Sequence, residues 1–229
     1  MRILFDEKVA QVYDTWYETE QGKLADSLER ELMWRIGSFN PKEKILDIGC
    51  GTGHLLQFFT ARGMEGTGID VSFPMLRVAK NKLDPRIGFC LAKAEALPFK
   101  ARTFDCIVFM TTLEFVENPL EALKEAVRVS RDKILLGVLN KYSLIGLTRR
   151  IKGIFRPSIY SQARFYSIWE LKKMLTYAPE RLHIRWGSVL TFPLSCQQHF
   201  DKIEKILSFR KNHLGAFLVL GIWKRKLVQ

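Results

Sequence analysis

The chain has 229 residues, of which 47% are hydrophobic and 26% are charged, and this predicts a single globular domain over residues 1–229 with one large core. The longest apolar run, Leu214 to Trp223, has ten residues, whereas a membrane-spanning helix needs about 20. The N-terminal residues become acidic before a signal-type apolar run develops. The four cysteines are widely spaced, without a CxxC pair. We therefore expect a cytoplasmic protein with reduced thiols.

The net charge of +12 belongs to the C-terminal part of the chain. Residues 1–140 contain 19 Lys and Arg against 20 Asp and Glu, whereas residues 141–229 contain 17 against 4. This asymmetry is typical of a region that faces an acidic substrate, a nucleic acid or an anionic surface, and equally of a solvated basic face without a partner. Both interpretations stay open from charge alone.

The order of predicted elements indicates βα units. The first 40 residues predict a helical cover, with Leu24, Leu28 and Leu32 at helical spacing. From Lys44 onward, short apolar runs alternate with helical stretches, as in a mainly parallel sheet. The predicted strands are 45–48, 66–70, 86–91, 104–109, 133–139, 183–186 and 214–223. The predicted helices begin near residues 55, 74, 119, 168 and 200, where Asn118 caps the third and a Ser167–Glu170 capping box opens the fourth.

A glycine-rich turn follows the first predicted strand, at residues 47–53 with the sequence DIGCGTG. Glycines there let the backbone turn tightly and approach a ligand over the carboxyl end of the strand. Asp70 ends the second strand, where a carboxylate can accept bonds from two ribose hydroxyls. The spacing is GxGxG, whereas dinucleotide enzymes have GxGxxG. We expect a nucleoside-type cofactor; the alternatives are a dinucleotide, or a plain turn with Asp70 as a helix cap.

Further segments follow in a recognisable order. They are residues 68–72 with Met75-Leu76, residues 94–99, Phe104-Asp105 and Arg128-Val129. Together with residues 46–53, they resemble the successive motifs of class I S-adenosylmethionine-dependent methyltransferases, in the branch similar to ubiquinone and menaquinone biosynthesis methyltransferases. The resemblance implies an α/β fold, a Rossmann-like three-layer sandwich with a seven-stranded, mainly parallel sheet whose last strand is antiparallel. It also implies S-adenosyl-L-methionine as the cofactor.

The family pattern, carried over position by position, implies twelve cofactor-binding residues. They are Asp47, Gly49 and Gly51 against the methionine end, Asp70 at the ribose, Val71 and Met75 against the adenine face, Ala94 and Glu95 at the adenine edge, Met110 and Thr111 beside the sulfonium, and Tyr13 and Tyr17 in an N-terminal lid. No metal site is expected, because Cys196, His199 and His213 lack a fourth ligand and a recognised spacing.

Three positions depart from the family pattern. Lys93 stands where an acidic residue commonly accepts a bond from the adenine amino group, and lysine can only donate; this contact is expected to be either lost or taken over by Glu95. Glu114 replaces a His often found after the fourth strand. Arg131-Asp132 replaces Gly-Gly before the fifth strand and is expected to alter only a turn.

Methyl transfer from a sulfonium requires mainly positioning and desolvation, so no fixed catalytic triad is expected. For an acceptor that must lose a proton, Glu114 and Tyr17 are candidate bases. The structural alternative is that Glu114 caps an element or faces solvent.

Residues 140–165 predict a basic amphipathic insertion. It is a candidate substrate lid over a small or lipid-like acceptor, a contact to an anionic membrane surface or to RNA, or an ordinary packed helix with a solvated face. A small or lipid-like acceptor is preferred, because the chain contains no recognised RNA-binding module. The alternatives are an RNA methyltransferase, a non-catalytic cofactor-binding protein of this fold and a nicotinamide dehydrogenase.

Overall fold

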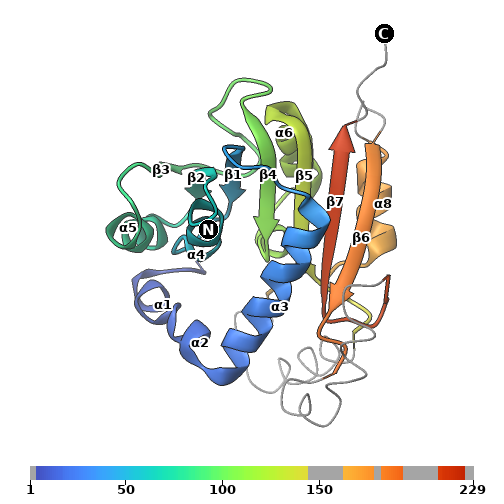
Figure 1. Cartoon of the computed structure of the whole chain (residues 1–229), viewed down its shortest axis with the longest axis horizontal. Coiled ribbons are helices and arrows are strands. Elements are labelled where there is room, and N and C mark those ends of the chain that lie inside the picture. The colour runs from blue at the N-terminus through green and yellow to red at the C-terminus, as the bar shows by residue number, and fades with distance from the viewer. Residues whose placement is uncertain (1–3, 144–161, 178–181, 193–210, 225–229) are drawn as a thin grey trace.

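The computed structural model describes residues 4–143, 162–177, 182–192 and 211–224. Within these residues, seven strands form one sheet in the order β3-β2-β1-β4-β5-β7-β6 (Figure 1). The strands are β1 Lys44–Ile48, β2 Glu65–Asp70, β3 Gly88–Leu91, β4 Phe104–Met110, β5 Ser130–Leu139, β6 Leu182–Val189 and β7 Phe217–Lys224. Strands β1 to β5 pair in parallel, and β7 is antiparallel to both β5 and β6. The predicted sheet, with its antiparallel last strand, is confirmed.

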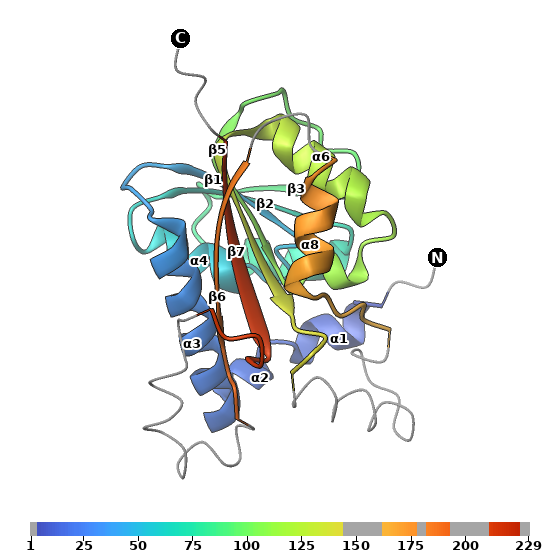
Figure 2. The same ribbon diagram turned by 90° about the vertical axis from the view of Figure 1, so that its right-hand side faces the viewer.

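Helices cover both faces of this sheet, which makes three layers (Figure 2). The described helices are α1 Glu7–Val12, α2 Thr15–Glu18, α3 Glu20–Gly37, α4 His54–Thr60, α5 Phe73–Lys82, η1 Leu113–Phe115, α6 Pro119–Val129 and α8 Ile168–Leu175. Helices α3 and α4 lie on one face, and α6 and α8 on the other. The predicted caps are confirmed: Asn118 Oδ1 accepts from the N–H of Glu121, and Ser167 and Glu170 form a capping box.

The core follows the alternation of side chains along buried strands. On β4, Cys106 and Val108 pack with the apolar residues of α3 and α4, whereas Ile107 and Phe109 pack with those of α6 and α8. Because β4 is buried on both faces, nearly every one of its residues must be apolar, as its sequence shows.

Two details differ from the sequence-based expectations. Leu24 of α3 is exposed, and the helix instead buries Leu32, Met33 and Ile36 against the sheet. Arg131-Asp132 lies inside β5 and not in a turn, beside a shift of register between Phe104 and Cys106. The Arg131 guanidinium there donates to Asp105 Oδ1 at 3.1 Å, so the two residues tie β5 to β4.

Several expectations fall outside the described residues. These are the predicted insertion from residue 144 to residue 161 and the predicted helix near residue 200, together with Cys196 and His199 of the rejected metal site. Among the helices that the structure describes, none has both the length and the apolar character that crossing a membrane would require.

Candidate active site

The glycine turn after β1 has the backbone that only glycine adopts easily. Gly49, Gly51 and Gly53 have φ angles of +71°, +52° and +77°, in the left-handed region. A Cβ at Gly49 would overlap the side chain of Thr112, whereas a Cβ at Gly51 would meet only the Met75 Cε, at 3.9 Å. Gly49 therefore lets the turn pack against the end of β4, and Gly51 leaves room beside Met75 for a ligand.

Asp70 organises this turn from the end of β2. Its Oδ2 accepts from the Gly51 N–H at 2.9 Å, and its Oδ1 accepts from the Ser72 N–H at 2.8 Å. Ser72, and not Asp70, caps α5, so the interpretation of Asp70 as a helix cap is wrong. Burial raises the pKa of Asp70, while its N–H donors oppose that rise. The carboxylate still has a lone pair beyond those that its N–H donors use, and with it Asp70 can accept from a hydroxyl.

Asp47 is a buried carboxyl group on β1, with an exposed fraction of 1%. Its Oδ1 has no hydrogen-bond partner among the described residues. Burial, together with the nearby Asp70, raises its pKa to about 8. A buried carboxyl group with an unpartnered oxygen is stabilised when a cation binds next to it. The methionine end of S-adenosylmethionine carries an ammonium and a sulfonium, so this residue fits that cofactor.

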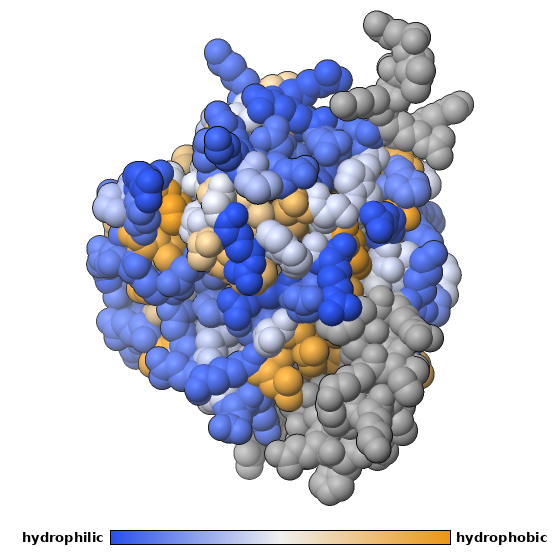
Figure 3. Space-filling view, viewed as in Figure 1, coloured by the Kyte–Doolittle hydropathy of each residue, from blue (hydrophilic) through white to orange (hydrophobic). Residues whose placement is uncertain are grey.

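Apolar side chains lie near Asp70, both next to it in the sequence and beside it in the sheet. Val71, the residue after Asp70, is exposed. Leu91 of β3, which pairs with Asp70 in the sheet, is exposed as well. Phe73, at the start of α5, is also exposed, whereas Met75 is buried. Figure 3 shows apolar side chains at the surface in the region of α5. An apolar surface beside a carboxylate suits a flat base attached to a ribose. Leu91 and Phe73 were not predicted.

The segment after β3 carries the predicted adenine-edge residues. Ala94 is buried, and Glu95 Oε1 accepts from the Asn118 N–H at 3.1 Å, so this carboxylate already holds the start of α6. Lys93 is exposed, and its Nζ lies 3.6 Å from Glu117 Oε2. Lys93 therefore pairs with Glu117, and Glu95 has only part of its accepting capacity left for a ligand.

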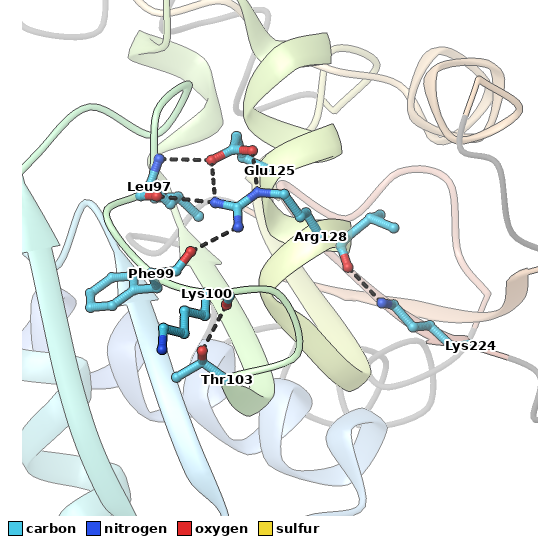
Figure 4. Close-up of polar contacts among 8 residues, drawn as sticks. Leu97, Phe99, Lys100, Thr103, Glu125, Arg128 and Lys224 are labelled. Atoms are coloured by element: carbon cyan, nitrogen blue, oxygen red, sulfur yellow. Dashed lines mark hydrogen bonds and ion pairs between the residues drawn. The ribbon is translucent and has the colours of Figure 1, made fainter.

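Arg128 on α6 clamps the same segment (Figure 4). Its guanidinium donates to the carbonyl oxygens of Phe99 and Leu97, at 2.7 and 3.0 Å, and to both oxygens of Glu125. Glu125 in turn accepts from the Leu97 N–H at 2.8 Å. One bidentate ion pair thereby fixes the loop that follows Ala94. Arg128, part of the Arg128-Val129 motif in the sequence, is therefore a residue that positions this loop.

The chain leaves β4 through a strained residue. Thr111 has a φ of +50°, which is rare for a β-branched residue and typical of functional sites. Its N–H donates to the Gly137 carbonyl at 2.8 Å. The next residue, Thr112, donates from Oγ1 to the Met110 carbonyl at 3.1 Å. The strain thus turns residues 110–112 onto the glycine turn, where Thr112 contacts Gly49.

Glu114 in η1 is a second buried carboxyl group, with an exposed fraction of 2%. Its Oε1 accepts from the Leu139 N–H at 2.6 Å, at the end of β5, and its Oε2 has no partner among the described residues. Burial raises its pKa to about 8. Glu114 therefore does not face solvent. Glu114 is mostly protonated at pH 7. Its carboxyl group, which lies at the carboxyl ends of β4 and β5, can therefore donate a hydrogen bond.

A row of aromatic rings in successive contact extends from His54 of α4 to Phe115 of η1. Tyr17 stacks on His54 with ring centroids 3.9 Å apart, and Tyr13 lies between Tyr17 and Phe5 at 6.1 and 6.2 Å. Phe5 then contacts Phe115 at 5.3 Å. Burial, followed by the influence of Tyr13, raises the pKa of Tyr17 well above its ordinary value, so Tyr17 is a neutral phenol and a poor base.

Polar contacts anchor this N-terminal segment to both sides of the glycine turn. The Ser72 hydroxyl donates to the Phe5 carbonyl at 2.6 Å. Asp14 accepts from the Thr52 hydroxyl at 2.5 Å and from Lys82 Nζ at 2.6 Å. Sequence reasoning predicted Tyr13 and Tyr17 here but missed Phe5 and Asp14. No periodicity or motif links these residues to partners so far along the chain.

The strand order, the glycine turn after β1 and the carboxylate after β2 define a Rossmann-like enzyme that uses S-adenosylmethionine. Residues 46–135 match the family described as methyltransferase domain. The ubiquinone/menaquinone biosynthesis C-methyltransferase of Agrobacterium fabrum is 31% identical over 198 residues, 81% of this chain and 73% of that protein. The demethylmenaquinone methyltransferase of Renibacterium salmoninarum is 34% identical over 91 residues, 40% of this chain and 38% of that protein.

Solved structures show the same fold. A S-adenosylmethionine-dependent methyltransferase of Thermotoga maritima has a TM-score of 0.73 at 24% identity, over 97% of this chain and 98% of that one. Magnesium protoporphyrin IX methyltransferase of Synechocystis, with bound S-adenosylhomocysteine, has a TM-score of 0.69 at 15% identity, over 98% of each chain. The chain belongs to the class I S-adenosylmethionine-dependent methyltransferases, and its cofactor is S-adenosylmethionine.

Proposed function

We propose that this methyltransferase acts on a small or lipid-like acceptor that binds at the carboxyl ends of β4 and β5. The observation that carries the proposal is the buried Glu114 carboxyl group, whose Oε2 has no partner among the described residues while Oε1 is held by the Leu139 N–H. A protonated carboxyl group kept without a partner is costly. An acceptor oxygen that receives its hydrogen bond would remove that cost.

The cofactor contacts in this proposal follow the geometry of the site. Asp47 neutralises the ammonium at the methionine end, and Asp70 accepts from the ribose hydroxyls. The remaining predicted contacts are Gly49 and Gly51 under the methionine end, Val71, Met75, Ala94 and Glu95 around the adenine, Met110 and Thr111 beside the sulfonium, and Tyr13 and Tyr17 as a cover. We add the exposed Leu91 and Phe73 to the adenine surface.

S-adenosylmethionine, when bound, supplies an electrophilic methyl group on a sulfonium leaving group. The chain contributes position and exclusion of water. Glu114 orients the acceptor by donating from its neutral carboxyl group. Since Glu114 and Tyr17 are mostly neutral at pH 7, we infer that the acceptor binds as an anion that has already lost its proton to solvent, as an acidic phenol or enol does, and that methyl transfer to this anion leaves neutral S-adenosylhomocysteine. Quinone-biosynthesis methyltransferases among the relatives support this class of acceptor.

We also infer a cytoplasmic location. Cys50, Cys90 and Cys106 are unpaired thiols within the described part of the chain. Burial raises the pKa of Cys50 and Cys106 well above their ordinary values, which keeps these thiols unreactive.

Calorimetric titration with S-adenosylhomocysteine tests the cofactor site. We expect micromolar binding to the wild-type protein, loss of binding in Asp70→Ala, and no effect of Asp84→Ala, which changes an exposed carboxylate that pairs with Arg86. Titration with NAD serves as the ligand control. Tight NAD binding without S-adenosylhomocysteine binding would contradict the assignment.

Transfer of labelled methyl groups tests the acceptor. We expect label in hydrophobic phenols or quinols and none in single-stranded RNA. Label in RNA alone would refute the small-acceptor proposal and favour an RNA methyltransferase. Cofactor binding without transfer to any acceptor would favour a non-catalytic protein of this fold.

A further inference from the structure

A cluster of exposed aromatic side chains lies beyond the end of β5. Tyr142, Trp169 of α8 and Leu214 have exposed fractions of 54%, 57% and 51%. The Trp169 ring stacks on His213, with centroids 4.7 Å apart and planes at 6°. Tyr142 meets Trp169 edge to face at 5.9 Å. Three segments that are distant in the sequence thus place apolar rings together at the surface, where they are costly unless they contact a partner.

A buried asparagine holds this cluster in place. Asn140, at the end of β5, donates from Nδ2 to the carbonyl oxygens of His213 and Gly215, both at 2.7 Å. Its Oδ1 accepts from the Tyr142 N–H at 3.1 Å. One side chain therefore fixes both of the loops that carry the rings. The cluster is built into the fold and does not result from a chance approach of loose side chains.

Positive charge lies beside the rings. Lys172 and Lys173 are exposed and follow Trp169 by three and four residues on α8, so all three share one stripe of the helix. The acidic group on this part of α8, Glu170, is neutralised by Lys141, whose Nζ lies 2.9 Å from its Oε1. In the sequence, the part of the chain that contains these residues, 141–229, carries 17 basic against 4 acidic residues.

We propose that the surface formed by Tyr142, Trp169, His213 and Leu214 with Lys172 and Lys173 docks on an anionic lipid bilayer. Tyrosine and tryptophan favour the boundary between headgroups and acyl chains, and lysines are attracted by anionic headgroups. Single-stranded RNA fits less well, because base stacking needs free ring faces and one face of Trp169 is already covered by His213.

The place of this surface adds a reason for docking. Its first residue, Tyr142, lies two residues after Asn140, and β5 ends at Leu139, whose N–H binds Glu114. A lipid-like acceptor drawn from a bilayer would therefore enter close to the carboxyl group proposed to receive it. This link rests on the proposed function, whereas docking itself does not depend on the identity of the acceptor.

Sedimentation of the full-length protein with vesicles tests the proposal. We expect binding to vesicles of phosphatidylcholine with phosphatidylglycerol, and much weaker binding to phosphatidylcholine alone. A lysine close to an anionic surface strengthens binding about fivefold, so Lys172→Glu/Lys173→Glu should weaken it by about thirtyfold or more. Tyr142→Ser/Trp169→Ser should also weaken it, and this loss should persist at high salt, where charge attraction is screened.

Matched variants elsewhere on the surface are the controls. Tyr177→Ser removes an exposed aromatic ring from the turn after α8, and Lys80→Glu/Lys100→Glu reverses two exposed charges, one on α5 and one in the loop before β4. Both should bind vesicles like the wild type. Equal loss in the controls, no binding of the wild type to anionic vesicles, or RNA binding lost in the same variants would each overturn the proposal.

S-adenosylhomocysteine binding, measured on every variant, separates this proposal from the proposed function. Variants that keep cofactor binding but lose vesicle binding support docking by this surface. Wild-type protein that binds vesicles but no cofactor would refute the proposed cofactor site and leave the docking surface intact.

Discussion

Replacing Asp47 by asparagine should remove a proton-linked step from cofactor binding. The free protein holds Asp47 protonated, with a pKa of about 8, whereas a bound ammonium stabilises the carboxylate. Binding must therefore release a proton below pH 8, and the affinity of the wild type should fall by nearly tenfold for each pH unit below 7, or about fiftyfold between pH 8 and pH 6. An asparagine has no proton to release, so its weaker binding should not follow this pH dependence.

The same change should stabilise the free protein at alkaline pH. The folded-state pKa of Asp47 lies above its ordinary value of 3.8, so between these values the folded state binds more protons than the unfolded state, and stability falls as the pH rises through this window. The shift sets an upper limit of about 6 kcal/mol for the loss above pH 8. A recovery of even 1 kcal/mol would raise Tm by about 2–4 °C in a chain of this size.

Titration calorimetry in two buffers of different ionisation enthalpy measures the released proton directly. At pH 7 we expect close to one proton released by the wild type and none by Asp47→Asn. Thermal denaturation at pH 5.5 and pH 8 measures the change in stability. The control is Asp84→Asn, an exposed carboxylate whose pKa is lowered to about 2 by Arg86. Cofactor binding without proton release in the wild type would refute the reasoning.

Three further changes test other parts of the site. In the wild type, the Michaelis constant for the acceptor should rise around pH 8, because the Glu114 carboxyl group has a pKa of about 8 and loses its proton there. In Glu114→Gln, the Michaelis constant should stay low through pH 8. Parallel pH profiles of the two proteins would contradict this role. Arg128→Ala should lower the free energy of unfolding by about 2–3 kcal/mol, since it removes charged hydrogen bonds to the loop after β3, and denaturant titration measures this. Gly49→Ala should lower the free energy of unfolding more than Gly63→Ala. Both glycines have positive φ, but only the new Cβ at position 49 would overlap a side chain, that of Thr112. Equal losses would show that backbone strain alone matters.

Local sequence signals predicted the sheet and its helix starts. The caps at Asn118 and Ser167 use partners three residues away, and the strands follow from short apolar runs, so each lies within reach of a local pattern. The predicted buried face of α3 was right for Leu32 and Leu28 and wrong for Leu24, because apolar residues at helical spacing occur on more than one side of this helix and only contact with the sheet selects Met33 over Leu24.

The polar interior of the site could not be predicted in the same way. Glu114 binds the N–H of a residue 25 positions away, and Asn140 binds carbonyls more than 70 positions away. No periodicity connects such pairs. The family pattern predicted Asp47 and Asp70 as cofactor-binding residues. Only the structure explains the difference between them: burial keeps a proton on Asp47 at neutral pH, whereas backbone N–H groups bind Asp70.

The anchoring of the N-terminal segment has a consequence for exchange of the cofactor. Its polar contacts, such as that between Asp14 and Lys82, are partly exposed, and contacts of this kind contribute only about 0–1 kcal/mol each. We therefore expect this segment to open locally while the sheet remains folded, at a free energy below that of global unfolding. Amide protons of α1 should then exchange with solvent much faster than those of β4, and a bound ligand should slow the exchange of α1 selectively.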